Sequence, residues 1–117
     1  MNDQFKGIIL YNIELDGNLN GVYTNNHPNT RGEIYTETAR LKKNFPQFNN
    51  NTEVREYDAF YFDLNNERVD CLLKFSIQNR IIDVIWESLD RRRRVLFRGQ
   101  GFQMNDRQIA ISYWLSN

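Results

Sequence analysis

Two residue types that carry much of enzyme and metal chemistry occur once each, as Cys71 and His27. A lone cysteine excludes an internal disulfide and any metal site built from several thiolates. A lone histidine leaves too few groups for the common zinc and catalytic constellations. We therefore expect a non-enzymatic protein without a metal or a cofactor. Cys71 alternates with apolar residues and is expected to be buried, whereas His27 lies in a polar, turn-rich stretch typical of a surface loop.

Residues 16–21 (DGNLNG) match the first half of a calcium-binding loop, in which alternating oxygen ligands surround the ion. The twelfth position of such a loop should be a bidentate glutamate, and here it is His27. Asp-Gly is also a preferred dipeptide of tight hairpin turns, because glycine accepts a positive φ without strain. The pattern predicts a turn here and not a metal site.

Four consecutive arginines, Arg91–Arg94, form the one run of like charge. Such a run could hold a phosphate or another anion, and Arg92, Arg93 and Arg94 are the candidate residues for it. The same run could be a solvated turn whose side chains pair with nearby acidic residues, of which Glu87 and Asp90 are the sequence neighbours. Both interpretations stay open from the sequence.

Alternation of apolar and polar residues with period two recurs along the chain and predicts β-strands. Residues 32–42 could also be helical, because Thr30 and Glu33 resemble a capping box, but their β-branched and aromatic content favours a strand. Pro46 and a run of asparagines predict one long connection over residues 43–53. Eight strands are expected, at residues 5–15, 19–26, 32–42, 54–64, 68–78, 81–89, 94–103 and 107–115.

Short turns between the expected strands favour antiparallel pairing of sequence neighbours, and no helix is expected that could link parallel strands. Eight such strands close into a single up-and-down antiparallel β-barrel over residues 1–117, which leaves no exposed edge. A β-sandwich built from the same strands is the alternative. Gly99 and Gly101, two residues apart on one face, suit a sharp bend of the kind that a closed barrel needs.

The interior of an eight-stranded barrel holds side chains or one small ligand. Alternation around Trp86 decides what faces inward: either Asp83 and Glu87 point into the barrel, or Trp86 does and the two carboxylates lie outside. The second arrangement is favoured, because buried carboxylates need partners. We expect the interior aromatic residues that could line a ligand site to be Tyr11, Tyr23, Trp86, Phe97 and Trp114.

Two stretches, residues 17–24 (GNLNGVYT) and 95–102 (VLFRGQGF) followed by Trp114 and Leu115, resemble hairpins of the avidin and streptavidin family and of related calycin-type barrels. They cover a small part of the chain and resemble that family at the level of the barrel superfold. The resemblance implies an eight-stranded barrel in which Tyr23 would be a polar contact to a ligand and Phe97 and Trp114 would be wall residues. It does not extend to a particular ligand.

The chain carries 15 Lys and Arg against 15 Asp and Glu, so its formal net charge is zero. A neutral domain is not drawn as a whole to nucleic acid or to an anionic membrane, and we expect a cytoplasmic protein. Several strands are apolar on both faces, which indicates a covering segment or a homo-oligomer. The favoured function is binding of a small apolar ligand. The alternative is a protein–protein interaction, inhibitor or assembly module with a filled core.

Overall fold

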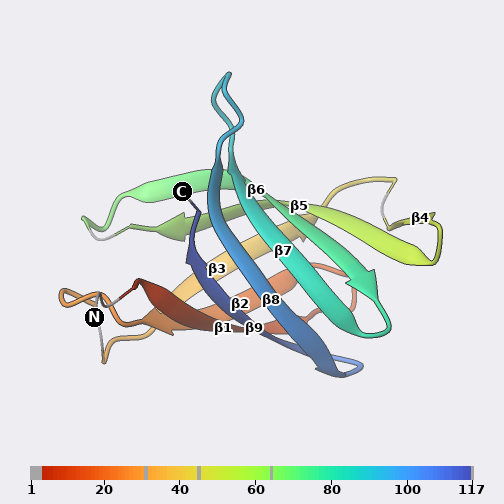
Figure 1. Ribbon diagram of the computed structural model, residues 1–117, viewed down its shortest axis with the longest axis horizontal. Coiled ribbons are helices and arrows are strands. Elements are labelled where there is room, and N and C mark those ends of the chain that lie inside the picture. The colour runs from red at the N-terminus through yellow and green to blue at the C-terminus, as the bar shows by residue number, and fades with distance from the viewer. Residues whose placement is uncertain (1–3, 31, 45, 64, 117) are drawn as a thin grey trace.

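The computed structural model describes residues 4–30, 32–44, 46–63 and 65–116, and these residues form nine β-strands and no helix (Figure 1). Most strands are seven to eleven residues long and alternate between covered and exposed side chains, as their sequence pattern predicts. The strands are β1 (Lys6–Ile13), β2 (Leu19–Asn25), β3 (Tyr35–Leu41), β4 (Gln47–Asn49), β5 (Thr52–Phe62), β6 (Arg68–Gln78), β7 (Ile81–Ser88), β8 (Val95–Asn105) and β9 (Gln108–Leu115).

Eight of the nine strands close into an antiparallel up-and-down barrel. The order β3-β2-β1-β9-β8-β7-β6-β5 follows the chain, apart from the join of the two terminal strands, β1 and β9. Pairing of β3 with β5, in which Ala39 lies opposite Ala59, closes the ring. The barrel predicted from the alternation is confirmed, and the sandwich alternative is not formed. Residues 35–41 are a strand, so the helical interpretation of that segment was wrong.

The segment expected to be one long connection, residues 43–53, is instead partly strand. β4 lies in it and pairs with β5 outside the ring, and β5 itself begins at Thr52. Asn50 and Asn51 join these two strands with φ of 51° and 69°. Asparagine adopts this left-handed backbone more readily than most residues. The asparagine run therefore encodes a tight hairpin, which the absence of apolar periodicity concealed.

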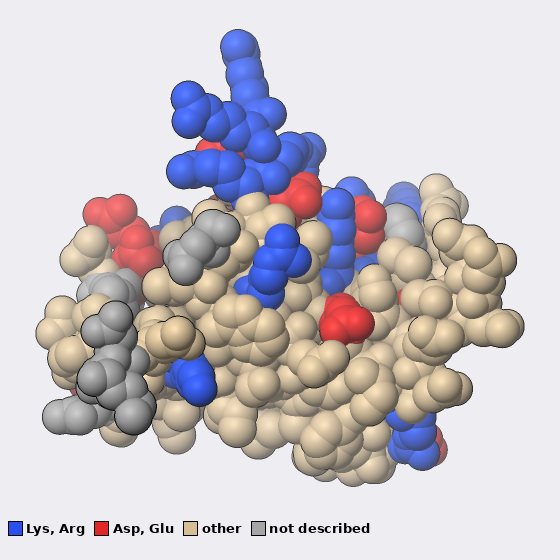
Figure 2. Space-filling view, viewed as in Figure 1, with Lys and Arg blue, Asp and Glu red and all other residues tan. Residues whose placement is uncertain are grey.

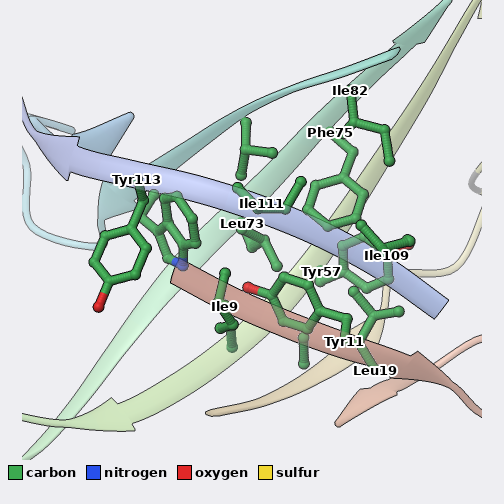
Figure 3. Close-up of a cluster of buried hydrophobic side chains, with 14 of the residues drawn as sticks. Ile9, Tyr11, Leu19, Tyr57, Leu73, Phe75, Ile82, Ile109, Ile111 and Tyr113 are labelled. Atoms are coloured by element: carbon green, nitrogen blue, oxygen red, sulfur yellow. The ribbon is translucent and has the colours of Figure 1, made fainter. Parts of the chain in front are cut away.

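One end of the barrel is filled by large side chains (Figure 3). Tyr11, Tyr57 and Phe75 pack together, with ring centroids 5.8 Å apart for Tyr11 and Phe75 and 5.1 Å apart for Tyr57 and Phe75. Aliphatic residues complete this packing, namely Leu19, Leu73, Ile82, Ile109 and Ile111. Toward the other end, Figure 3 shows Tyr113 standing apart from this packed group.

The alternation of β7 places Trp86 inside the barrel, where it is 3% exposed. Asp83 is exposed, and Glu87 forms an outer-face ion pair with Lys74 across β6 and β7 (3.3 Å). The favoured arrangement of this strand is therefore confirmed. Cys71 is buried, as expected.

Candidate functional site

A cavity of about 340 Å³ opens at the end of the barrel opposite the packed aromatic group. It lies among the inward-facing residues at the start of β1 and β3, the ends of β2, β5 and β9, and the adjoining halves of β7 and β8. Its lining is Phe5, Ile9, Tyr23, Asn25, His27, Thr30, Tyr35, Glu37, Tyr61, Phe62, Asp63, Trp86, Phe97, Tyr113 and Leu115.

The wall of this cavity is a connected set of aromatic rings. The ring centroid of Phe97 lies 5.8–6.2 Å from the ring centroids of Phe5, Tyr61, Trp86 and Tyr113. Aromatic contacts at these distances add to the stability that burial alone gives. The rings support one another, so the wall is held in shape by its own packing.

Hydrogen bonds fix two of the wall tyrosines to the backbone of other segments. Tyr23 stacks on Tyr35 at 5.7 Å between centroids, and its hydroxyl donates to the carbonyl of Phe62 (3.0 Å). The hydroxyl of Tyr113 donates to the carbonyl of Thr24 (3.3 Å). Burial raises the pKa of Tyr113 to about 12, and it also raises the pKa of Tyr23. These hydroxyls are therefore neutral donors at physiological pH.

Glu37 is the ionisable residue of the cavity floor. Its side chain belongs to β3 and is 4% exposed. The Tyr11 hydroxyl donates to Oε2 and the Trp86 indole Nε1–H donates to Oε1 (3.0 Å). Burial raises the pKa of the Glu37 carboxyl to about 7, and the two donated hydrogen bonds oppose that rise. The floor is thus a carboxyl group held by donors from two other strands.

The lining carries more acidic than basic groups. Besides Glu37 it includes Asp63, near the mouth, and His27, which sits in the loop after β2 with Nδ1 accepting from the backbone N–H of Asn29 (3.1 Å). Among the described residues that line it, none is a lysine or an arginine. The ionisable side chains of the cavity are therefore mainly acidic and lie inside an aromatic wall.

The structure separates the five residues expected to line a ligand site. Tyr23, Trp86 and Phe97 line the cavity together. Tyr11 is buried beneath it and reaches it through its hydrogen bond to Glu37. The interior position expected for Trp114 was wrong, because it is 39% exposed on the outer face. β9 alternates with period two, so the inward place belongs to Tyr113.

Other residues of the site, Glu37 above all, were not among those expected from the sequence. Glu37 shares the alternating inward face of its strand with Tyr35 and Ala39. A carboxyl on an otherwise apolar face was the signal that could have found it, since charged groups are almost never buried without a function or a partner.

The arginine run forms the turn between β7 and β8, which projects from the barrel (Figures 1 and 2). Arg92, Arg93 and Arg94 are exposed and do not line the cavity. Arg94 pairs with Asp90 (3.1 Å), whose Oδ1 also accepts from the backbone N–H of Arg92. These contacts are those of a solvated turn, although Glu87 pairs with Lys74 and not with an arginine. Anion binding by the three arginines stays a prediction.

No protein-family model matches this chain, no curated protein is significantly similar to it, and no solved structure matches its fold significantly. The resemblance to avidin-type barrels is therefore supported only at the level of an eight-stranded antiparallel barrel. The described part of the chain contains no helix long and apolar enough to cross a membrane.

Proposed function

We propose that this barrel is a non-enzymatic binding protein that holds a small, largely apolar ligand in the cavity at its open end. The observation that carries the proposal is the cavity itself, about 340 Å³ in volume and walled by aromatic rings. Ligand pockets typically measure roughly 300–1,000 Å³ and combine an apolar lining with a few placed polar groups. The polar groups here are Asn25, His27, Thr30, Glu37, Asp63 and the tyrosine hydroxyls.

The packing of the wall supports a ligand site over an incidental void. Rings that are already fixed by stacking and by hydrogen bonds, such as Tyr23 on Tyr35, lose little conformational entropy when a ligand binds. The opposite end of the same barrel is occupied by Tyr11, Tyr57 and Phe75, whose rings are in contact, so large side chains can fill an interior of this width. The cavity lies only at the open end of the interior that the structure describes.

Substituting Tyr23→Ala is expected to weaken ligand binding at least tenfold, because it removes a wall ring and its contact with Tyr35. Binding of the neutral probes 2-phenylethanol and 2-naphthol is measured by the fluorescence of Trp86. The measurement uses a Trp114→Phe background, in which Trp86 is the one remaining tryptophan. Native mass spectrometry of the purified protein tests in parallel for a retained small molecule. The loss of stability should be modest, on the order of 1–2 kcal/mol, because Tyr23 is only half-buried.

The matched control is Val22→Ala, the neighbouring residue on β2, whose side chain points outward. It should bind the probes as the parent does. Equal affinities of the Tyr23→Ala and Val22→Ala proteins would contradict the proposal. So would the combined absence of a retained molecule and of any probe binding.

A second candidate function, association of two copies of this chain, is favoured by a row of apolar residues on the outer face. Each residue of this row lies opposite the next one on the adjacent strand, so the row crosses five neighbouring strands without a gap. The row is Val22, Leu10, Ala110, Phe102 and Ile81, of which the four large members are each about half exposed. Figure 2 shows few charged side chains over the lower part of the face formed by β7, β8 and β9.

Leu10→Glu is expected to convert a dimer to a monomer, because it places a charge in the middle of this apolar row. Sedimentation velocity measures the change, and Asn12→Glu, on the same outer face of β1 but beyond the row, is the control. A parent protein that is monomeric at all accessible concentrations would remove this second function and leave the first untouched.

A further inference from the structure

We propose that the ligand of this cavity is a cationic amine, whose ammonium group contacts Glu37 while its apolar portion lies against the aromatic wall. This inference rests on the proposed function and specifies the chemical class of the ligand. It is carried by three features of the cavity floor: the hydrogen bonds that Glu37 receives, the lack of a counter-charge for it among the described residues, and the rings beside it.

The two hydrogen bonds at Glu37 are arranged for a carboxylate. Both partners, the Tyr11 hydroxyl and the Trp86 indole, donate to it, one to each oxygen. An ionised carboxyl is an acceptor only, with about four lone-pair positions. Two positions are used by these donors, so each oxygen keeps capacity for a donor from the cavity. An ammonium group has such donors and no acceptor.

Glu37 also has no positively charged partner among the residues that the structure describes. No ion pair of the described residues includes it, and no lysine or arginine lines the cavity among them. A buried carboxylate is costly unless it is paired as well as hydrogen-bonded. The tyrosine and the indole supply hydrogen bonds but no charge. A cation entering the cavity would supply the missing charge.

The rings beside Glu37 suit a cation as well as an apolar group. Trp86, which holds Oε1, packs against Tyr113 at 5.7 Å and Phe97 at 6.2 Å between centroids. Ammonium groups are attracted to the faces of aromatic rings, most strongly to that of tryptophan. An arylalkylamine would use the carboxylate for its head and the rings of Tyr23, Phe97 and Tyr113 for its apolar part.

Among Glu37 and the groups that face it in the cavity floor, Glu37 is the one whose charge changes near neutral pH. The facing groups are Tyr11 on β1, Tyr23 on β2, Tyr61 on β5, Cys71 on β6 and Tyr113 on β9. Burial raises the pKa of each, so all five stay neutral to well above pH 8. On its own strand Glu37 is flanked by Tyr35, and His27 and Asp63 lie at the mouth.

The test compares 2-phenylethylamine with its neutral counterpart 2-phenylethanol on the Trp114→Phe protein and on the same protein carrying Glu37→Gln. At pH 8 the amine should bind the parent at least tenfold more tightly than the alcohol does, as expected for a hydrogen bond to a charged group. Glu37→Gln should abolish that preference and leave alcohol binding within about threefold of the parent. Its circular dichroism and melting temperature show whether it folds.

The pH profile gives a second readout. Affinity of the parent for the amine should rise between pH 5 and pH 8 as Glu37 ionises, and the Glu37→Gln profile should be flat. Asp63→Asn and His27→Asn are the controls for charge at the mouth and should keep the rise.

The outcomes separate the two proposals. Equal binding of amine and alcohol, or an amine preference that survives Glu37→Gln, overturns the inference and leaves the proposed binding function standing. Binding of neither probe while native mass spectrometry finds a retained neutral molecule does the same. Absence of all binding and of any retained molecule overturns both.

Discussion

Gly101→Ala is expected to lower the free energy of unfolding by at least ~3 kcal/mol, which corresponds to a fall of more than about 10 °C in the melting temperature. An added Cβ at this position would lie 1.8 Å from the carbonyl oxygen of Ala110 and 2.7 Å from Cα of Ile111. Both are backbone atoms of β9, the strand paired with β8. The overlap can therefore be relieved only by separating two strands of the closed ring.

Thermal unfolding followed by circular dichroism measures this effect. Gln100→Ala is the matched control, because Gln100 precedes Gly101 on the same strand and points outward, where it makes one exposed hydrogen bond to Asp83. It should change the free energy of unfolding by less than ~0.5 kcal/mol. A Gly101→Ala protein as stable as this control would contradict the close approach of β8 and β9.

A second large effect is expected from Glu37, with a sign opposite to that of most carboxylates. Burial raises the pKa of Glu37 from 4.5 to about 7 in the folded protein. Between these values the folded chain binds more protons than the unfolded chain does, so stability falls as the pH rises. A rise in pKa from 4.5 to about 7 corresponds to roughly 3 kcal/mol, which is fully present as a penalty above pH 7.

Urea unfolding of the parent and of the Glu37→Gln protein at pH 5 and pH 8 measures this penalty. As the pH rises from 5 to 8, the free energy of unfolding of the Glu37→Gln protein should increase relative to that of the parent by a large part of that energy. The comparison is repeated in a His27→Asn background, because His27 also lines the cavity. A difference that is constant between pH 5 and pH 8 would show that Glu37 does not titrate as a buried acid.

The sequence predicted the barrel because period-two alternation is a local signal that repeats on every long strand. The inward position of Trp86 followed from the same pattern, since the opposite choice would have buried Asp83 and Glu87. The spacing of Gly99 and Gly101, two residues apart on β8, was also informative, because an added Cβ at either position would meet atoms of β9. What these features share is that neighbours along one strand decide them.

Three features were not predicted from the sequence, each for a different reason. β4 is only three residues long, and neither this strand nor the turn at Asn50 and Asn51 that follows it shows an apolar periodicity. Trp114 was placed inside by its resemblance to a barrel wall residue, although alternation assigned that place to Tyr113. The role of Glu37 emerges only when β1, β3 and β7 meet, because its two donors are 26 and 49 residues away.

The two indole N–H signals in a ¹H–¹⁵N correlation spectrum test the central claim, that the open end of this barrel is a ligand site, most directly. Trp86 lies at the cavity floor and Trp114 on the outer face, so the second signal, assigned with Trp114→Phe, is an internal reference. Titration with 2-phenylethanol and 2-phenylethylamine should shift the Trp86 signal saturably and leave that of Trp114 in place. A Trp86 signal that stays fixed with both compounds, or shifts of both indoles that grow without saturation, would contradict it.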